Sequence, residues 1–429
     1  PWCKDPSQLP NNYAQALGRL KGTEKRLAQD QSHAETYNAQ IEDLVNRGCA
    51  EKMSPSEITS YKGPVYYLSH HAVLRPEKKS TPCRLVFNSA ANFRGHVLND
   101  YQYKGPNLLN NITGVLLRFR ENEVGVCGDV SKMYHSVLTM PPIDSNTHRF
   151  LWRNMEVDRE PDIYKKLVLT FGDKSSPALA NTAMNLTAEE HQSQYPDATA
   201  SILRCRYMDD ICESYTDIST ATTQVTQMDE ILLSGNFKIK EWLSNKQIFP
   251  VAADDPVEPR TLAGSEEKVL GIYWDREQDE LRVAVKPPKL LSDMQNSTTL
   301  AMPRTLSKRM VLSVAAGIFD IIGFVTPFVI KAKIAIQKLW KEKYEWDSNL
   351  PDDVKLEWFN WFQQLAKIDQ VRFERCLTPK SVAGDPTLVI FCDSSSQSFG
   401  AVAYIRWSLI DNVLETRFVT AKSRVALLR

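Results

Sequence analysis

The sequence predicts an α+β protein with several sub-domains. Its 429 residues are too many for one ordinary domain, and a 42% apolar content suffices for about two or three hydrophobic cores. Short strand-like runs alternate with helices from Tyr61 to about Asp158, and a helical pattern precedes them. We therefore expect mixed sheets and helices that follow a helical N-terminal segment.

Residues 11–48 predict mostly helix, because apolar side chains recur with a period of about 3.6 and Gly48 supplies a stop. The apolar positions are Leu17, Leu20, Leu27, Tyr37, Ile41, Leu44 and Val45. A connection that contains Pro and Ser then reaches Tyr61. Residues 1–60 are therefore interpreted as an N-terminal helical extension.

Further helices are predicted inside the strand-rich part of the chain. Residues 108–120 are helix-like, with apolar side chains on one side. Pro177 suits the first turn of a helix that extends toward Gln192, and Gly235 closes another helix over residues 220–233.

Two adjacent carboxylates, Asp209 and Asp210, lie at a predicted tight turn between strand-like residues 202–208 and 211–215. Such a hairpin holds its turn carboxylates outward, as a site that binds divalent metal and nucleotide phosphates requires. An Asp pair is also ordinary turn chemistry, because Asp tolerates the backbone angles of a turn. The metal interpretation therefore needs a further carboxylate.

Asp129 is the candidate for that carboxylate, since it ends a short apolar strand-like run that begins at Val124. Two Mg²⁺ ions about 4 Å apart need bridging carboxylates, and in-line phosphoryl transfer uses one ion on the attacking hydroxyl and one on the leaving pyrophosphate. Asp129 and Asp209 could bridge both ions, with Asp210 as a flanking ligand. Taken alone, Asp129 is more simply a strand-end residue.

The order and spacing of these residues resemble motifs A and C of reverse transcriptases. Tyr134 follows Asp129 by five residues, and Tyr207-Met208-Asp209-Asp210 places its first carboxylate 80 residues after Asp129. Other blocks follow the same order: residues 83–88 resemble the fingers strand, 170–177 motif B, 235–238 and 240–242 motif D, and 269–274 the motif E hairpin.

More narrowly, the chain is similar, nearly end to end, to the BEL/Pao clade of LTR retrotransposon polyproteins. The blocks that carry this likeness are residues 67–73, 98–100, 105–109, 116–120, 319–324 and 421–424. The sequence departs from the pattern at Asn88, where the clade usually has Asp, and at Ser69, where Pro is usual. Asp173 adds a carboxylate to a loop near the expected triphosphate path, where it would repel substrate or face water.

The resemblance implies a right-hand polymerase with fingers, palm and thumb, followed by a helical connection and a truncated RNase H-like start. Fingers and palm would occupy residues 61–285, after the N-terminal extension. A basic helical thumb and connection would occupy residues 286–380, and a partial RNase H-like segment residues 381–429.

Site roles are also implied by the resemblance. Arg84, with Lys78 or Lys79, would bind the triphosphate of the incoming nucleotide. Tyr134 would lie under the sugar of that nucleotide and exclude a 2′-hydroxyl, so that dNTPs are selected. The simpler interpretation of Tyr134 is an aromatic ring packed in the core. The other implied substrate-binding residues are Phe171, where retroviral enzymes have Gln, Tyr207 and Met208. The implied primer grip comprises Leu270, Gly271, Tyr273 and Trp274. Lys240 or Lys246 would aid proton donation to pyrophosphate, although each is more simply a surface lysine.

The implied cofactors are two Mg²⁺ ions, which Mn²⁺ could replace, held by Asp129, Asp209 and Asp210. The implied partners are an RNA or DNA template, a DNA or tRNA primer, dNTPs and the rest of a polyprotein. We expect an intracellular protein, in a cytoplasmic particle, because no signal peptide or membrane-spanning segment is evident. A start at Pro1 rather than Met suggests a fragment of a longer product.

The formal net charge is zero, but the charges are unevenly distributed. Residues 286–343 hold ten Lys or Arg against three acids. This excess predicts a thumb that follows the nucleic-acid duplex, and a solvated helix face is the alternative. Eight cysteines show no Cys-x-x-Cys spacing and are interpreted as reduced core thiols.

The C-terminal segment resembles the opening of an RNase H fold. Residues 388–395 and 399–404 predict two strands, and Asp393 is the one carboxylate that matches the family. Because such a nuclease needs several carboxylates around its metals, we expect no RNase H activity from these residues. No Asp-Thr-Gly or Asp-Ser-Gly occurs, so aspartic protease activity is not expected either.

These observations predict an RNA-directed DNA polymerase, and they leave two alternatives. One is a decayed or co-opted nucleic-acid-binding remnant of a polymerase, which Asn88, Asp173 and the truncated end suggest. Against it, all three carboxylates are present, although a protein that no longer catalyses would not need to keep them. A nucleotidyl cyclase would not explain the primer-grip and thumb blocks.

Overall fold

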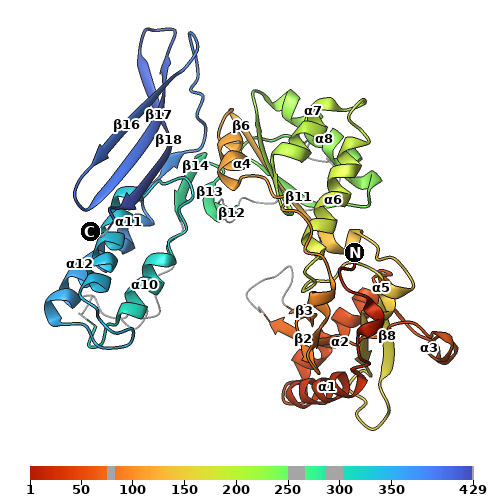
Figure 1. Cartoon of the computed structure of the whole chain (residues 1–429). Helices are drawn as coiled ribbons and strands as arrows, with labels where there is room; N and C mark the ends of the chain where they lie inside the picture. Colours follow the sequence, from red (N-terminus) through yellow and green to blue (C-terminus); the bar gives the residue numbers. More distant parts are fainter. Residues whose placement is uncertain (75–82, 250–265, 284, 286–302, 428–429) are drawn as a thin grey trace. The chain divides into compact units, whose positions relative to one another are not determined.

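A computed structural model describes residues 1–74, 83–249, 266–283, 285 and 303–427 (Figure 1). The chain divides into two compact units. The first unit comprises residues 1–109, 130–199 and 229–239, and the second comprises residues 110–129, 200–228 and 240–429. Both contain helices and strands, as the predicted α+β class requires. The predicted domain boundaries after residues 60, 285 and 380 stay predictions.

Two helices open the first unit, α1 (Tyr13–Leu27) and α2 (Gln31–Asn46), where the sequence predicted mostly helix. Asp30 separates them, because its side chain accepts a hydrogen bond from the His33 N–H and caps α2. The apolar sides of both helices pack on three strands, β2 (Ser69–Leu74), β3 (Cys83–Asn88) and β7 (Arg149–Trp152).

The sheets of the first unit are small and antiparallel. Strand β8 lies between β1 and β7, while β2 pairs with β3 and β4 pairs with β5. The remaining elements assigned largely to this unit are η1 (Pro6–Gln8), β1 (Ala50–Lys52), α3 (Pro55–Ser60), β4 (Asn92–Phe93), β5 (His96–Val97), η2 (Leu98–Tyr101), η3 (Met133–Ser136), α5 (Ile143–Asn146), β8 (Asp162–Lys166) and α6 (Ser176–Glu189).

A four-stranded sheet forms the core of the second unit, in the order β11 (Ile239–Ser244), β6 (Val124–Val130), β10 (Asp210–Tyr215) and β9 (Arg206–Tyr207). Helix α4 (Ile112–Phe119) packs against β9 and β10. Helices α7 (Pro196–Arg204) and α8 (Ile218–Ser234) contribute residues to both units.

A second antiparallel sheet has the order β12 (Glu266–Val269), β13 (Ile272–Asp275), β14 (Glu280–Val283) and β15 (Phe373–Glu374). Leu270 and Gly271 form the two-residue turn between β12 and β13, with φ values of 47° and 94°. Two positive φ angles are typical of a type I′ hairpin turn. The motif E block therefore forms the hairpin that its resemblance implies.

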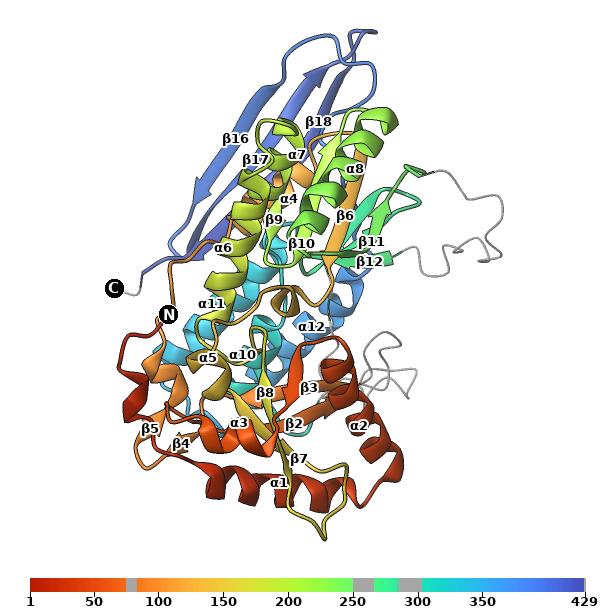
Figure 2. The same ribbon diagram turned by 90° about the vertical axis from the view of Figure 1, so that its right-hand side faces the viewer.

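Within the described residues, three further helices and a three-stranded sheet belong to the second unit. The helices are α10 (Lys308–Ala316), α11 (Thr326–Lys341) and α12 (Asp352–Ile368), and the strands are β16 (Thr387–Ser394), β17 (Ser398–Ser408) and β18 (Leu414–Val425). The strands run side by side as one antiparallel sheet (Figures 1 and 2). The Ala421 N–H on β18 donates to the Ile322 carbonyl at 2.9 Å, which ties this sheet to the segment before α11.

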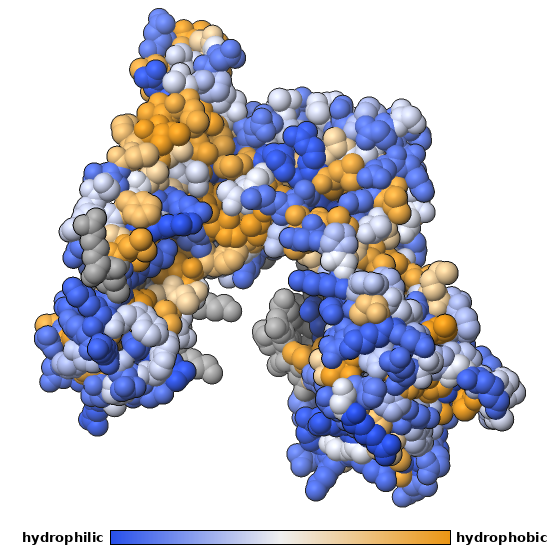
Figure 3. Space-filling view, viewed as in Figure 1, coloured by the Kyte–Doolittle hydropathy of each residue, from blue (hydrophilic) through white to orange (hydrophobic). Residues whose placement is uncertain are grey.

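Apolar side chains gather on the surface of that sheet (Figure 3). Leu388, Ile390 and Phe391 of β16 are each more than half exposed.

The eight cysteines are free thiols. Five are buried, as predicted for core thiols, whereas Cys3 and Cys392 are exposed and Cys376 is half-buried, so the core interpretation is wrong for these three.

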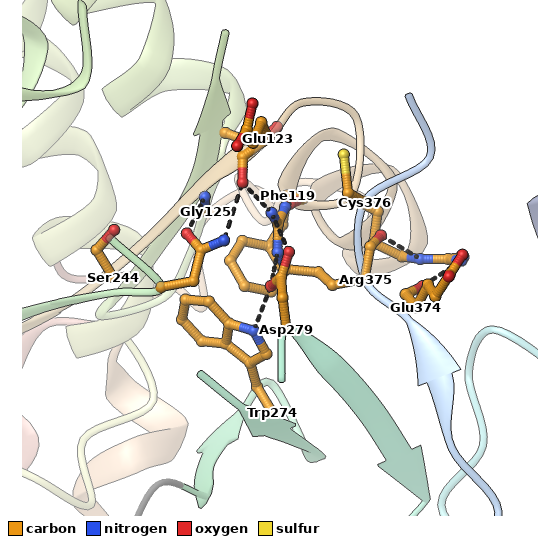
Figure 4. Close-up of polar contacts among 12 residues, drawn as sticks. Phe119, Glu123, Gly125, Ser244, Trp274, Asp279, Glu374, Arg375 and Cys376 are labelled. Carbon is orange, nitrogen blue, oxygen red and sulfur yellow. Dashed lines mark hydrogen bonds and ion pairs between the residues drawn. The ribbon is translucent and has the colours of Figure 1, made fainter. Parts of the chain in front are cut away.

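Arg375, directly after β15, joins the β13–β14 turn to the segment between α4 and β6 (Figure 4). Its side chain is fully buried and pairs with Asp279, at 2.6 Å from Nε to Oδ1 and 2.8 Å from Nη2 to Oδ2. The guanidinium also donates to the carbonyls of Phe119, Asn122 and Glu123 at 2.6–3.0 Å. The charge is therefore satisfied on every side, as a buried arginine requires.

Arg120 lies buried beside this network and donates only to backbone carbonyls. Its acceptors are the carbonyl oxygens of Arg375, Val419, Glu374 and Phe418, at 3.2, 2.9, 3.4 and 2.6 Å. Burial lowers the pKa of Arg120 to about 9. The two arginines together connect the end of α4 with β15 and β18.

We predict that Arg375→Met lowers the free energy of unfolding by about 3 kcal/mol, because Asp279 and three carbonyls lose their donors. Denaturant titration of the full chain measures the change. Lys380→Met is the matched control, since the Lys380 side chain is 84% exposed, and it should change stability by less than about 0.5 kcal/mol. Equal stability of the two variants would contradict the role assigned to Arg375.

Candidate active site

The predicted hairpin forms at Tyr207–Asp210. Tyr207 on β9 pairs with Asp210 on β10, so that Met208 and Asp209 make a two-residue turn. Met208 has φ of 57°, a left-handed conformation that costs energy in a residue other than glycine. Asp210 in turn lies opposite Asp129, at the end of β6. The strand register thus brings all three predicted carboxylates to one end of β6 and β10.

The local electrostatics show that the carboxylates repel one another. Burial, followed by the charge of Asp209, raises the pKa of Asp129, and the charge of Lys240 opposes this shift. Burial, followed by the charges of Asp209 and Asp129, raises the pKa of Asp210 to about 7. A divalent cation would relieve this repulsion.

Carboxylate oxygens are the ligands that Mg²⁺ prefers, so the chemistry of this group fits that ion. Within the described residues, however, no three Asp, Glu, His or Cys side chains converge as a ready-made metal site. Asp210 is less exposed than Asp129 and Asp209. The division into two bridging ligands and one flanking ligand stays a prediction.

Close packing supports the strand that carries Asp129. A Cβ added to Gly128 would lie 2.6 Å from the Trp242 ring, so only glycine fits beneath that side chain. Cys127 and Cys212 face each other across β6 and β10, and both are buried. We did not predict this support from the sequence, because Gly128 and Trp242 lie 114 residues apart and belong to different motifs.

Two lysines of the motif D region have different surroundings. Lys240 is exposed on β11 and its charge acts on Asp129. Lys246 instead pairs with Glu123, at 3.3 Å from Nζ to Oε1. Lys240 is therefore the better placed of the two for contact with a group at the carboxylates.

In the first unit, Tyr134 lies in η3 and is 8% exposed. Its ring packs on Phe171, with 4.5 Å between ring centroids. Phe171 is 38% exposed and so presents the accessible part of this aromatic pair. The two residues that the sequence assigned to substrate binding are thus brought together, and their contact with a sugar stays a prediction.

The predicted triphosphate ligands are less fully described. Arg84 is exposed on β3, whereas Lys78 and Lys79 lie outside the described residues. Asn88, the departure from the clade pattern, accepts a hydrogen bond from the Ala90 N–H at 3.1 Å. It therefore acts as a turn residue at the end of β3.

Asp173 does not face water, which was one of the two expectations from the sequence. The carboxylate is buried, accepts a hydrogen bond from Ser89, and lies 2.9 Å from Nε2 of His148. The expectation of exposure to water is therefore wrong, because the carboxylate contacts partners that lie 84 and 25 residues away in sequence. Repulsion of substrate stays a prediction.

The implied primer-grip residues differ in accessibility. Trp274 is fully buried and donates from Nε1 to Asp279 at 2.9 Å, so its side chain belongs to the core. Leu270 and Gly271 form the hairpin turn, while Tyr273 is half-buried with the Arg282 guanidinium 4.3 Å from its ring centroid. Contact of this hairpin with a primer stays a prediction.

Asp393 lies exposed on β16, where it pairs with Gly400 on β17. A cavity beside it is also lined by Lys422 and Arg424, and Asp393 is the one acid among the described residues that line it. The expectation that these residues give no RNase H activity stays a prediction.

Two family models match the chain. Residues 89–242, which contain all three carboxylates, match reverse transcriptase (RNA-dependent DNA polymerase), and residues 307–429 match the Pao retrotransposon-like RNaseH-like domain. The two matches thus follow one another along the chain, reverse transcriptase first and the Pao RNaseH-like model second.

Solved structures share the fold of this chain. One is the foamy viral protease-reverse transcriptase dRH in complex with double-stranded DNA, with a TM-score of 0.55, 16% identity, and coverage of 91% of this chain and 55% of that one. Another is the foamy viral protease-reverse transcriptase in complex with an RNA/DNA hybrid, with a TM-score of 0.53, 13% identity, and coverage of 99% and 45%. The chain thus spans about half the length of each viral protein.

No curated protein matches this chain. Among the described residues, no helix has the length and apolar character needed to cross a membrane.

We predict that Asp210→Asn raises the melting temperature in the absence of divalent cations, because it removes one of three repelling charges. A rise on the order of 2 °C is expected. Added Mg²⁺ should raise the melting temperature of the unmodified chain more than that of the variant. Equal Mg²⁺ responses would contradict a cation site at Asp210.

Proposed function

We propose that this chain is the RNA-directed DNA polymerase of a BEL/Pao-type retrotransposon. It would catalyse template-directed attack of a primer 3′-hydroxyl on the α-phosphate of a dNTP. The observation that carries this proposal is the register of β6 and β10, which sets Asp129 opposite Asp210 with Asp209 in the adjoining turn. The match of residues 89–242 to reverse transcriptases supports it.

The carboxylates Asp129, Asp209 and Asp210 would hold two Mg²⁺ ions, which Mn²⁺ could replace. Bound there, the ions would activate the 3′-hydroxyl and stabilise the leaving pyrophosphate. Asp129 and Asp209 would contact both ions, and Asp210 would contact one. Lys240 would supply a proton or a positive charge to the pyrophosphate.

Nucleotide selection would rest on the aromatic pair in the first unit. Tyr134 and Phe171 would form the surface against the sugar, and Arg84 would contact the triphosphate. The contact between the two rings limits the movement of Tyr134, which supports its use as a barrier to a 2′-hydroxyl.

Template and primer binding would use the basic helices of the second unit. Four lysines of α11 are exposed: Lys331, Lys333, Lys338 and Lys341. Lys308 is different, because it is buried with Nζ 4.0 Å from the centroid of the Trp340 ring. The exposed lysines support a phosphate-binding surface, and Lys308 has a packing role. The two viral structures are complexes with nucleic-acid duplexes, which supports duplex binding here. The primer would be DNA or tRNA, and the parent polyprotein would act in a cytoplasmic particle.

The function is tested by dNTP incorporation on an oligo(dT)-primed poly(rA) template with Mg²⁺ or Mn²⁺. We expect extension by the unmodified chain and none by Asp209→Asn, because that substitution removes a metal ligand and its charge. Asp197→Asn is the matched control, since Asp197 is an exposed carboxylate of α7, and it should leave extension unchanged. Absence of extension by folded chain that binds primer-template would favour the decayed binding protein.

A second prediction concerns sugar selection. Tyr134→Val should increase the use of ribonucleotides relative to dNTPs, because the smaller side chain leaves room for a 2′-hydroxyl. Competition between rNTP and dNTP in the same extension assay measures the ratio. Tyr103→Val, at a 57% exposed tyrosine, is the control. A ratio unchanged in an active Tyr134 variant would remove the sugar contact from the proposal.

A further inference from the structure

The loop that carries Phe171 has a backbone that only glycine can adopt. Gly172 has φ of 117°, and a Cβ there would lie 2.5 Å from the Phe87 carbonyl oxygen of β3. The loop therefore lies directly against the fingers strand, and Phe171 precedes the point of closest approach. Any shift of this loop moves a ring that packs on Tyr134.

Asn99 bonds to the backbone on both sides of Asp173. Its Nδ2 donates to the Gly172 carbonyl at 3.0 Å, and its Oδ1 accepts from the Lys174 N–H at 2.8 Å. Ser176 Oγ closes the loop by donating to the Thr170 carbonyl at 2.8 Å. These bonds satisfy the backbone groups of the loop, but they do not hold its side chains.

Asp173 supplies the side-chain anchor. Its carboxylate turns into the unit, where Ser89 Oγ donates to Oδ1 and His148 Nε2 lies 2.9 Å from Oδ2. The side chains of His148 and Asp173 are 4% and 6% exposed. A buried ion pair of this kind costs much free energy if one partner is removed.

His148 has acceptors at both ring nitrogens. Nδ1 lies 2.6 Å from the Asp144 carbonyl oxygen, and Nε2 faces the Asp173 carboxylate. A neutral imidazole carries only one N–H, so both bonds require the imidazolium form. The loop is thus tied to α5 and β7 by a charged hydrogen-bonded pair rather than by neutral contacts.

The other charged groups around this pair are Asp144 and Lys166. Asp173 and then Asp144 counter the effect of burial, and the pKa of His148 is raised above its ordinary value. Lys166 on β8 is buried and close enough to act on Asp173, and burial lowers the pKa of Lys166 to about 8. Gln102 Nε2 lies 3.5 Å from His148 Nε2, and this side chain is neutral.

From this geometry we infer that Asp173 and His148 are positioning residues for the nucleotide sugar. They fix the loop before α6 so that Phe171 holds Tyr134 in place, and they touch neither nucleotide nor metal themselves. The inference rests on the proposed polymerase function. It also explains how an extra carboxylate can be tolerated in a loop near a triphosphate, since its charge is neutralised inside the unit.

The test compares His148→Gln and Asp173→Asn with the unmodified chain in single-nucleotide extension. We expect the KM for dNTP to rise about tenfold, with kcat changed less than about twofold, and the rNTP-to-dNTP incorporation ratio to rise. Asp173→Asn keeps the acceptor for Ser89, so its effect should be the smaller. His33→Gln is the matched control, because His33 and Asp30 form an exposed pair 3.1 Å apart.

The pH dependence of KM separates positioning from general support of the fold. Since the raised pKa keeps His148 charged below it, the KM for dNTP should rise as the pH increases through that pKa. This rise should be absent in His148→Gln. If KM still rises with pH in His148→Gln, the rise belongs to Lys166 and the inference is overturned. Unchanged KM and unchanged sugar selection in both variants would also overturn it.

A readout that needs no polymerase activity distinguishes failure of this inference from failure of the proposed function. Hydrogen exchange of the amides from Gly172 to Ser176 should quicken in His148→Gln, with melting temperatures used to confirm that the variant is folded. Unchanged exchange would overturn the inference even if the chain extends primers. Faster exchange in a chain that extends no primer would uphold the anchor and overturn its role in sugar selection.

Discussion

The pairing of β10 with β6 is the constraint on which the candidate active site depends. It sets Asp210 opposite Asp129 and leaves Asp209 in the turn to β9. A shift of one residue in this register would turn the carboxylates to opposite faces of the sheet. Gly128, with no room for a Cβ beneath Trp242, and the buried Cys127 and Cys212 keep the strands in that register.

The two buried arginines show how the rest of the second unit is connected to this sheet. Arg375 satisfies carbonyls at the end of α4 and in the approach to β6, while Arg120 satisfies carbonyls of β15 and β18. Both groups exchange strong hydration for several charge-assisted hydrogen bonds. Asp279 also accepts a hydrogen bond from Trp274 of β13. One carboxylate therefore holds both Arg375 and a core residue of the β13–β14 hairpin.

Much of the candidate site could be predicted from the sequence, because its signals are local. A carboxylate pair in a turn, flanked by strand-like runs, led to the hairpin at Asp209. The helical region that contains α1 and α2 was predicted from the 3.6-residue period of its apolar side chains and from Gly48 at its end. By contrast, the sequence could not show that Asp173 is buried against His148, that Trp274 is a core residue, or that Lys308 packs between tryptophan rings. Each of these depends on partners brought together by tertiary packing, and an isolated charge or aromatic residue carries no signal of its partner.

Metal binding by the paired carboxylates is the central claim, and it is tested most directly by electron paramagnetic resonance of Mn²⁺ bound with primer-template and a non-hydrolysable dNTP analogue. The account predicts two magnetically coupled ions per chain, and loss of the coupled pair in Asp129→Asn. A coupled pair that persists in that variant, or a single isolated ion in the unmodified chain, would contradict it.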